Sequence, residues 1–377
     1  MPSDCETLTL AIHASPHQMV MALSGGGTRA LAELLEVPGA SRTLLEAVVP
    51  YSRPALLRWL GGRPDRFCSA RTARAMAMVA FCRAGRLTEP GTDRLLGVAC
   101  TAGLATDRAR QGEHRAHVAV QTDEATACWS LHMAKDRRSR REEEQLVAAL
   151  VLNAVAEACE VADRVPLALC SDESVNAARA TARPAWRELL LGRREVVCEH
   201  GATQTPVALL SGAFNPLHVG HRRMAEAAER MLGGPVHFEL PIINADKPPL
   251  DYMELEYRLG QFVANQPVLL TRSATFEAKS ALFRGVTFIV GVDTVRRIAS
   301  PTYYGNDLAA QRAALERIAQ RDCRFLVFGR DMGTGFMRLG DLDLPDCLRA
   351  ICREVPADVF REDISSTTLR RKAEAAE

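Results

Sequence analysis

Apolar residues in the first part of the chain form two kinds of pattern. Residues 96–101 and 117–121 are short, nearly continuous apolar runs, whereas 31–35, 71–83 and 143–162 carry apolar residues three or four positions apart. Short apolar runs are typical of buried strands, and the wider spacing is typical of helices that cover them. We therefore expect strands over the first two segments and helices over the other three, which together predict an α/β domain.

The same alternation returns in the last part of the chain. Apolar runs lie near Val207, His237, Val268, Thr287 and Arg324, with helical spacing between them. Strands separated by helices predict a parallel, Rossmann-like sheet with its ligand site at the carboxyl ends of the strands. A chain of 377 residues is long for one core. We expect two α/β domains, over 1–165 and 204–377, joined by a Pro- and Arg-containing connector over 166–203.

The most distinctive segment is GAFNPLHVGH, from Gly212 to His221, directly after the apolar run at 207–210. Gly212 and the Asn-Pro pair predict a turn after a strand, and residues 219–232 then have helical spacing. Backbone N–H groups at a helix N-terminus attract anions, and a glycine between two histidines allows close approach to the main chain. His218 and His221 are thus placed to donate to one phosphate.

A second segment, ISSTTLR at 364–370, precedes a run of helix formers. Ser365, Ser366 and Thr367 form a cluster typical of a helix N-terminus, and Arg370 lies about one turn inside that helix. Hydroxyls, free N–H groups and a guanidinium make a second anion site. Two phosphate sites in one domain predict a triphosphate ligand.

The pair GxFxPxHxGH and late ISSTxxR resembles the HxGH nucleotidylyltransferase superfamily over roughly residues 204–372. Within it the chain looks most like nicotinamide mononucleotide adenylyltransferases, because Lys247 follows the second predicted strand and Gly291 and Asp293 follow a later one. The resemblance implies catalytic roles for His218, His221 and Arg370, and nucleotide binding by Gly212, Phe214, Asn215, Gly220, Lys247, Gly291, Asp293, Ser365, Ser366 and Thr367.

The implied reaction is transfer of AMP from ATP to nicotinamide or nicotinate mononucleotide with release of pyrophosphate. A phosphate of the acceptor attacks the α-phosphate in line, so positioning and charge stabilisation supply most of the acceleration and no protein nucleophile is needed. By resemblance, His221 lies nearest the α-phosphate and the ISSTxxR residues hold the β and γ groups. Mg²⁺ enters with ATP and bridges phosphate oxygens. The sequence predicts no metal cage in the protein.

Other interpretations remain open. The motifs select a triphosphate and not an acceptor, so a cytidylyl- or adenylyltransferase acting on another phosphorylated acceptor is an alternative. A non-catalytic pyridine-nucleotide-binding protein is another. Lys247 in a Pro-rich loop is equally typical of a solvated side chain, and Asp293 of a cap on the following helix.

The first domain carries a glycine-rich turn, Gly25 to Gly27, between a predicted strand and an amphipathic helix. Such a turn exposes N–H groups, so Ser24 and Thr28 could bind or attack an anionic or carbonyl group. The turn could equally be only a turn.

The order SxxGx, VPGAS, VVxYS and CTAGLAT in this domain resembles the C-terminal domain of CinA-type proteins, which include nicotinamide mononucleotide deamidases. That resemblance implies a pocket with Ser24 as nucleophile, together with Tyr51, Thr101, Arg137 and Arg141. The chain departs from the family at Leu56, where deamidases have a lysine, and at Gly26 and Thr28. A serine without a basic partner is a poor nucleophile. We expect a ligand-binding domain with altered or lost deamidase chemistry that associates with copies of itself.

Composition narrows the remaining classes. The formal net charge is +1, so no overall field attracts nucleic acid or a membrane surface. The 11 cysteines show no metal-ligand spacing and no secretory signal precedes them, which predicts reduced thiols and a cytoplasmic protein. The partners expected are ATP and a phosphorylated small-molecule acceptor.

Overall fold

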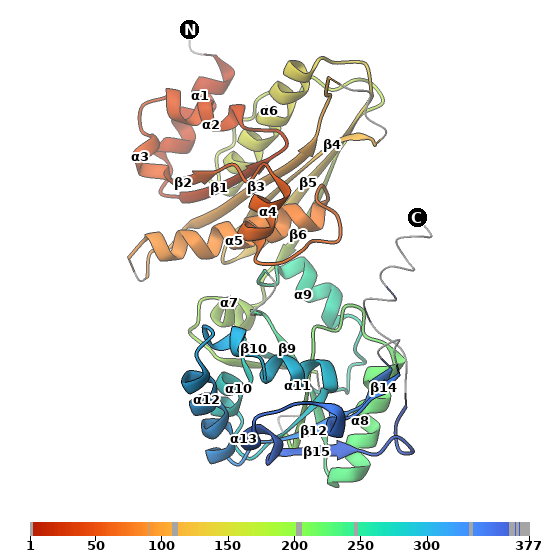
Figure 1. Ribbon diagram of the computed structural model, residues 1–377. Coiled ribbons are helices and arrows are strands. Elements are labelled where there is room, and N and C mark those ends of the chain that lie inside the picture. Colours follow the sequence, from red (N-terminus) through yellow and green to blue (C-terminus); the bar gives the residue numbers. More distant parts are fainter. Residues whose placement is uncertain are drawn as a thin grey trace. The chain divides into compact units, whose positions relative to one another are not determined.

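The computed structural model describes residues 3–89, 91–107, 112–200, 206–244, 248–331 and 335–361, together with residues 366 and 369 (Figure 1). The chain divides into two compact units. The first consists of Met1–Arg187 and Asp246–Glu254, and the second of Glu188–Ala245 and Leu255–Glu377. Both units are α/β, which confirms the predicted fold class.

The first unit is built on a six-stranded sheet with the order β2-β1-β3-β4-β5-β6. Strands β2, β1 and β3 run parallel, and β4, β5 and β6 continue the sheet in antiparallel pairs. The bounds are β1 Gln18–Ser24, β2 Leu44–Val48, β3 Leu95–Gly103, β4 His114–Gln121, β5 Ala125–Met133 and β6 Val175–Thr181.

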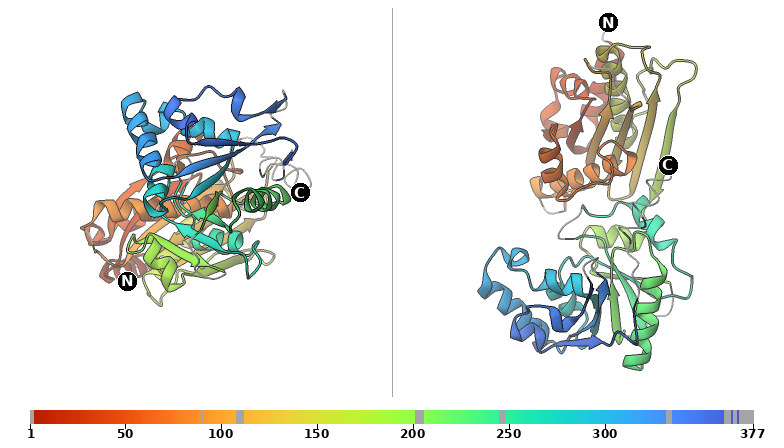
Figure 2. Two further views of the ribbon diagram at one scale, coloured as in Figure 1. Left: turned by 90° about the horizontal axis from the view of Figure 1, so that it is seen from below. Right: turned by 45° about the vertical axis from the view of Figure 1, so that its right-hand side comes forward.

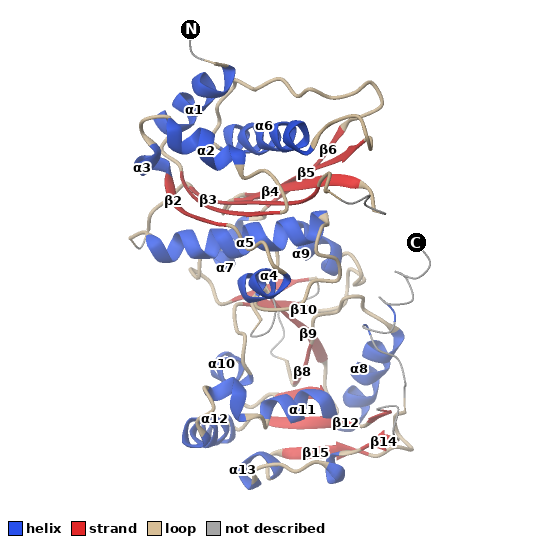
Figure 3. Cartoon of the chain, turned by 45° about the horizontal axis from the view of Figure 1, so that its top comes forward, coloured by secondary structure: helices blue, strands red, loops and turns tan. Residues whose placement is uncertain are grey.

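Helices cover both faces of this sheet (Figures 2 and 3). Helices α1, α2 and α6 lie on one face, and α4 and α5 on the other. The helices of the unit are α1 Asp4–Ala14, α2 Arg29–Glu36, α3 Ala40–Thr43, α4 Arg53–Leu60, α5 Ala70–Leu87 and α6 Arg140–Ala158.

Side-chain alternation along the strands decides which helix packs on which face. Leu96, Val98 and Cys100 of β3 join the core under α1, α2 and α6. Ala99 points to the other face and packs against α5. A Cβ on Gly97 would lie 2.0 Å from the carbonyl oxygen of Ala77, so α5 can approach β3 this closely only over a glycine.

The connector predicted at 166–203 supplies an edge strand to each sheet. Strand β6 pairs antiparallel with β5 in the first unit. Strand β7 (Val196–Glu199) pairs antiparallel with β10 (Val268–Thr271) in the second, and α7 (Pro184–Leu190) lies between them in sequence. The division between the units at Arg187 and Glu188 falls inside this segment.

The second unit is built on a seven-stranded sheet with the order β15-β12-β11-β8-β9-β10-β7. All strands except β7 run parallel, as the Rossmann-like prediction requires. The remaining bounds are β8 Ala208–Ser211, β9 Val236–Pro241, β11 Thr287–Gly291, β12 Arg324–Phe328 and β15 Cys352–Val355. Strand order reverses between β8 and β11, which creates a crevice at their carboxyl ends.

Helices of the second unit pack onto the sheet through apolar stripes. Val295 and Ile298 of α11 and Leu315 and Ile318 of α12 join one core with β11 and β12, and α8 lies along β8 and β9. The helices are α8 Val219–Leu232, α9 Tyr252–Leu259, α10 Phe276–Leu282, α11 Val292–Ile298, α12 Leu308–Gln320 and α13 Asp346–Arg349. Cys347 lies in α13 and Cys352 begins β15.

The segment 248–254 is part of the core of the first unit. Asp251 is 4% exposed and accepts a hydrogen bond from Arg74 Nε at 3.1 Å. Tyr252 donates to the carbonyl of Asp123 at 2.7 Å, and Met253 packs with Leu56. The first unit therefore needs a piece of chain that follows β9 of the second. Among the described residues, no helix combines the length and apolar character needed to cross a membrane.

Candidate functional site

The loop after β8 is shaped by a buried aromatic ring. Phe214 has a left-handed backbone (φ 44°) and is 1% exposed. A Cβ on Gly212 would lie 2.8 Å from that ring, so a larger residue would displace it. Phe214 packs edge-on against His221, with ring centroids 5.2 Å apart, and against Phe238 and Phe262. Phe214, expected in the nucleotide site, is thus the packing support of His221.

The two histidines lie at the N-terminus of α8. His218 occupies the N-cap and His221 the first turn, with their rings stacked at 3.7 Å between centroids. The backbone N–H of His218 donates to Nδ1 of His221 at 3.3 Å. A Cβ on Gly220 would meet the His218 ring at 3.1 Å, which explains the glycine between the histidines. The structure confirms a helix over 219–232 and brings both imidazoles together.

Side chains near the end of α9 hold the motif loop from behind. Gln261 Nε2 donates to the carbonyl of Phe214 at 2.9 Å, and its Oε1 accepts from the N–H of Leu217 at 2.7 Å. Arg258 donates to the carbonyl of Ala213 at 3.0 Å. These bonds satisfy backbone groups that a loop outside regular structure leaves unpaired.

Burial keeps both imidazoles neutral. It lowers the pKa of His221 to about 3, with further lowering from His218 and Arg330. Burial, followed by Arg330, also lowers the pKa of His218. Since Nδ1 of His221 accepts a hydrogen bond, its neutral tautomer carries the proton on Nε2. His221 therefore presents one N–H donor. The Nδ1 of His218 is buried and finds no partner among the described residues.

Asp293 follows β11, the neighbour of β8 on the other side of the crevice, and Arg330 follows β12, the next strand beyond β11. Asp293 lies in the first turn of α11, and its Oδ2 accepts from Arg330 Nη1 at 2.7 Å. The N-cap of α11 is Gly291, and Asp293 does not cap that helix. A Cβ on Gly291 would meet nothing within 4 Å, so packing alone does not demand a glycine there.

One described residue connects the two phosphate motifs. Ser366 Oγ donates to the carbonyl of Pro216 at 2.9 Å, although 150 positions separate them. Ser366 therefore reaches the HxGH loop. Asn215 lies half-buried in that loop. Four predicted site residues, Lys247, Ser365, Thr367 and Arg370, lie outside the described residues.

In the first unit, Ser24 and Thr101 are neighbours on β1 and β3. Ser24 Oγ donates to the carbonyl of Pro50 at 3.1 Å, and Thr101 Oγ1 to the carbonyl of Phe67 at 3.0 Å. Tyr51 is 67% exposed. The described residues thus bring the two hydroxyls together and give each a main-chain acceptor.

The arginine that reaches the glycine turn is not one of the two predicted. Arg137 and Arg141 are exposed, and Arg140 donates to the carbonyl of Gly25 at 3.0 Å. Consecutive residues at a helix start point in different directions. The positions of the arginines in the sequence therefore do not decide which of them faces the glycine turn.

The anion site expected at the glycine turn is occupied by the chain itself. The carboxylate of Glu144 accepts from the N–H of Gly27 at 3.0 Å, the hydroxyl of Thr28 at 2.9 Å and the N–H of Arg29 at 3.1 Å. Leu56, at the position where deamidases have a lysine, is 3% exposed and packs in the core under α4 and α5.

Residues 209–372 match the family described as cytidylyltransferase-like. The C-terminal part of this chain is therefore similar to cytidylyltransferase-like domains. A search of curated proteins found no match.

Several solved structures share 16–22% identity with this chain and cover about two fifths of it, at its N-terminal end. One is the competence/damage inducible protein CihA from Agrobacterium tumefaciens (22% identity, 42% of this chain and 94% of that chain, TM-score 0.32). A CinA superfamily protein from Escherichia coli is 17% identical, and the match covers 41% of this chain and 86% of that chain with a TM-score of 0.32. A competence or damage-inducible protein from Enterobacter asburiae is 16% identical, and the match covers 42% of this chain and 98% of that chain with a TM-score of 0.34.

Sequence reasoning missed three residues of the cytidylyltransferase-like domain that shape the site. Arg330 lies two positions after the end of β12, and an arginine just beyond the carboxyl end of a predicted strand was the available signal. Gln261 and Arg258 had no signal, because nothing local shows that a helix end will reach the HxGH loop.

Proposed function

We propose that the cytidylyltransferase-like domain transfers AMP from ATP to nicotinamide or nicotinate mononucleotide and releases pyrophosphate. The bond from Ser366 to Pro216 carries this proposal, because it joins the two anion-binding segments beside the stacked histidines. A triphosphate lying between them would have its α-phosphate near His221 and its outer phosphates near the ISST segment. The coarser conclusion, a nucleotidyltransferase-type domain, already follows from the family match.

The residues act by positioning and by stabilising charge. The N-terminus of α8 offers main-chain N–H groups, and Nε2 of His221 adds one donor on the same side. As the acceptor phosphate attacks and pyrophosphate departs, negative charge grows on phosphate oxygens. Arg370 and Lys247 would neutralise the outer phosphates and the acceptor. A neutral His221 also gains proton affinity as that charge develops, which strengthens its donation.

Mg²⁺ would enter bound to the triphosphate. Within the described ranges, no group of three or more His, Cys, Asp or Glu is placed to hold an ion. The hard oxygens that Mg²⁺ prefers would thus come mainly from ATP and water.

Asp293 would bind the acceptor. Its carboxylate is 38% exposed and is held in place by Arg330, so one oxygen is oriented while the other is available to a ribose hydroxyl or amide. A single contact of this kind would decide whether nicotinamide mononucleotide or nicotinate mononucleotide is the preferred acceptor.

We propose that the first unit binds a ligand without hydrolysing an amide. Ser24 Oγ donates to a main-chain carbonyl, and among the described residues no basic side chain is recorded as its partner. Leu56 is buried in the core and cannot supply one. Self-association would arise through this unit, and light scattering of the full chain tests it. No disulfide joins the cysteines in the described part of the chain, which fits a cytoplasmic location.

A second candidate is transfer of CMP from CTP to a phosphorylated alcohol, favoured by the description of the matching family. Pyrophosphate release separates the two. The purified chain is incubated with Mg²⁺ and either ATP or CTP, against nicotinamide mononucleotide, nicotinate mononucleotide, phosphopantetheine and phosphocholine, with ammonia followed in parallel. Turnover with ATP and a pyridine mononucleotide supports the proposal. Turnover only with CTP replaces it, and ammonia release contradicts the proposed loss of deamidation.

A further inference from the structure

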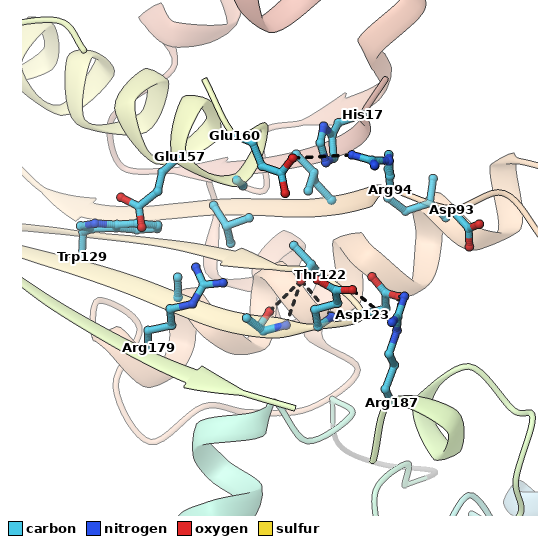
Figure 4. Close-up of a pocket in the computed structure, with 17 residues that line it drawn as sticks. His17, Asp93, Arg94, Thr122, Asp123, Trp129, Glu157, Glu160, Arg179 and Arg187 are labelled. Atoms are coloured by element: carbon cyan, nitrogen blue, oxygen red, sulfur yellow. Dashed lines mark hydrogen bonds and ion pairs between the residues drawn. The ribbon is translucent and has the colours of Figure 1, made fainter. Parts of the chain in front are cut away.

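The first unit contains a cavity of about 350 Å³ away from the Ser24 turn (Figure 4). It is lined at the starts of β1 and β3, at the β4–β5 turn and at the end of α6. Ser24 and Thr101 lie at the other ends of β1 and β3. Seven residues of β1 span roughly 20 Å at the usual rise per residue, so the cavity is separate from the Ser24 turn.

Part of the cavity lining is apolar, although most of it is polar. Leu96, Val120, Ala127 and the indole of Trp129 form the apolar part, and Trp129 is 9% exposed. The volume falls within the range of small-molecule sites, which combine an apolar body with a few convergent polar groups.

The polar lining carries an excess of negative charge. It includes five carboxylates, Asp93, Asp123, Glu124, Glu157 and Glu160, and three guanidinium groups, Arg94, Arg179 and Arg187. Most of the positive charge is already balanced, because Arg187 lies 2.6 Å from Asp123 and 3.1 Å from Glu124, and Arg94 lies 3.7 Å from Glu160. Figure 4 shows Glu157 beside the Trp129 ring. Glu157 also lies 3.9 Å from Arg164, a residue outside the lining. About one negative charge is then left for a positively charged ligand to offset.

A buried imidazole adds a hydrogen-bonding group without adding charge. His17 is 6% exposed, and its Nδ1 is buried with no partner in the part of the chain that the structure describes. Burial and Arg94 lower the pKa of His17, so the ring is neutral at neutral pH. Native proteins rarely leave a buried polar atom unpaired. A ligand carrying N–H donors supplies what a neutral imidazole and surplus carboxylates lack.

We propose that this cavity binds a small organic ammonium ion whose N–H groups face the carboxylates and whose apolar part packs on Trp129. Cations favour the faces of indole rings, and Trp129 offers such a ring among the apolar lining residues. The inference does not depend on the proposed nucleotidyl transfer, and the residues of the two sites do not overlap.

The test uses the full chain and three ligands that differ mainly in charge. Calorimetric titration with tyramine, a cation, should show binding, whereas 4-hydroxyphenylacetate, an anion of similar shape, should not bind. Tyrosine, a zwitterion, should bind more weakly than tyramine. No tyramine binding at 10 mM (about the weakest affinity that such a site would show), or stronger binding of the anion or the zwitterion, would overturn the proposal.

A matched pair of variants ties the binding to the cavity. Glu157→Gln removes one lining carboxylate whose side chain is 43% exposed, so folding should not suffer. Tyramine affinity should fall about tenfold or more, as expected for loss of a charge-assisted contact. Glu36→Gln changes an exposed carboxylate on α2 outside the cavity and should leave the affinity unchanged. Equal affinities for both variants would contradict the assignment.

Discussion

Two loops in this protein share one local plan and differ in what fills them. The turn at Gly25–Gly27 and the loop at Gly212–His218 both lead from a central strand into a helix. In the first, Glu144 occupies the N–H groups at the helix start. In the second, two neutral histidines stand at the helix start, and Nδ1 of His218 has no partner among the described residues. A strand, a glycine turn and a helix therefore define a place for an anion, and the surrounding chain decides whether a ligand or an internal carboxylate takes it.

The largest effect expected is on His221. His221→Ala removes the donor that we propose lies nearest the reacting phosphate. The loss of transition-state stabilisation should be roughly 3 to 5 kcal/mol, measured as a fall in kcat/KM, with acceptor binding nearly unchanged. Pyrophosphate release measures it. His132→Ala, at an exposed histidine of the first unit, is the control. Full activity in His221→Ala would remove the functional difference between the two loops.

Glu144→Ala should make the first loop resemble the second. Three donors lose their partner, so the free energy of unfolding should fall by about 1 to 3 kcal/mol. The vacated N–H groups should then take an anion, and added sulfate should raise the melting temperature of this variant more than that of the parent. Glu36→Ala serves as the matched control. An equal response to sulfate in all three proteins would show that the carboxylate does not guard an anion site.

The pH dependence of stability should report the buried imidazole. The pKa of His221 is lowered to about 3 in the folded chain, against about 6.5 when unfolded. The unfolded state therefore binds the proton more readily, and the stability contributed by neutral His221 is complete above pH 6.5 and is lost as the pH falls toward 3. The slope should reach about 1.4 kcal/mol per pH unit.

Denaturant unfolding at pH 7.5 and 5.5 measures this loss. His221→Gln should lose less stability on acidification than the parent, by about 1 kcal/mol, and His132→Gln should behave like the parent. An identical loss in His221→Gln would mean that the imidazole is not buried in neutral form.

The smallest effect is expected at Ser24. Ser24→Ala removes a bond to a main-chain carbonyl and should leave pyrophosphate release unchanged. The same assay as for His221 provides the comparison. A matching loss of activity would mean that the first unit takes part in nucleotidyl transfer.

Residues of the histidine site could be predicted from the sequence where the residues that contact each other are also close in sequence. His218, Gly220 and His221 lie within four positions, so their shared helix start was readable. Phe214 supports the ring of His221, and Gln261 and Arg258 hold the loop before it. Only folding of the chain brings these three side chains to the site. Arg330 required knowledge of strand order, because β12 lies two strands from β8 in the sheet.

The fold shows the same limit. Strands β3 and β4 are buried along most of their length, so apolar runs in the sequence predict them. Strand β6 is an edge strand with mostly exposed residues, so no hydrophobic pattern marks it, and it was expected to be part of a connector. No local pattern marks Glu144 as a partner of the glycine turn, since Gly27 and Thr28 lie more than a hundred positions away.

The segment 248–254 has a consequence for how this protein can be taken apart. A fragment ending at Arg187 would keep Arg74 but lose the Asp251 carboxylate, and it would leave the apolar cluster around Leu56 without Met253. A gene for the first unit alone would therefore encode a protein with an incomplete core. A gene for the remainder would encode a segment whose carboxylate and apolar side chains lack their binding partners. Separate expression, or exchange of either half for a homologue, requires redesign of that short stretch.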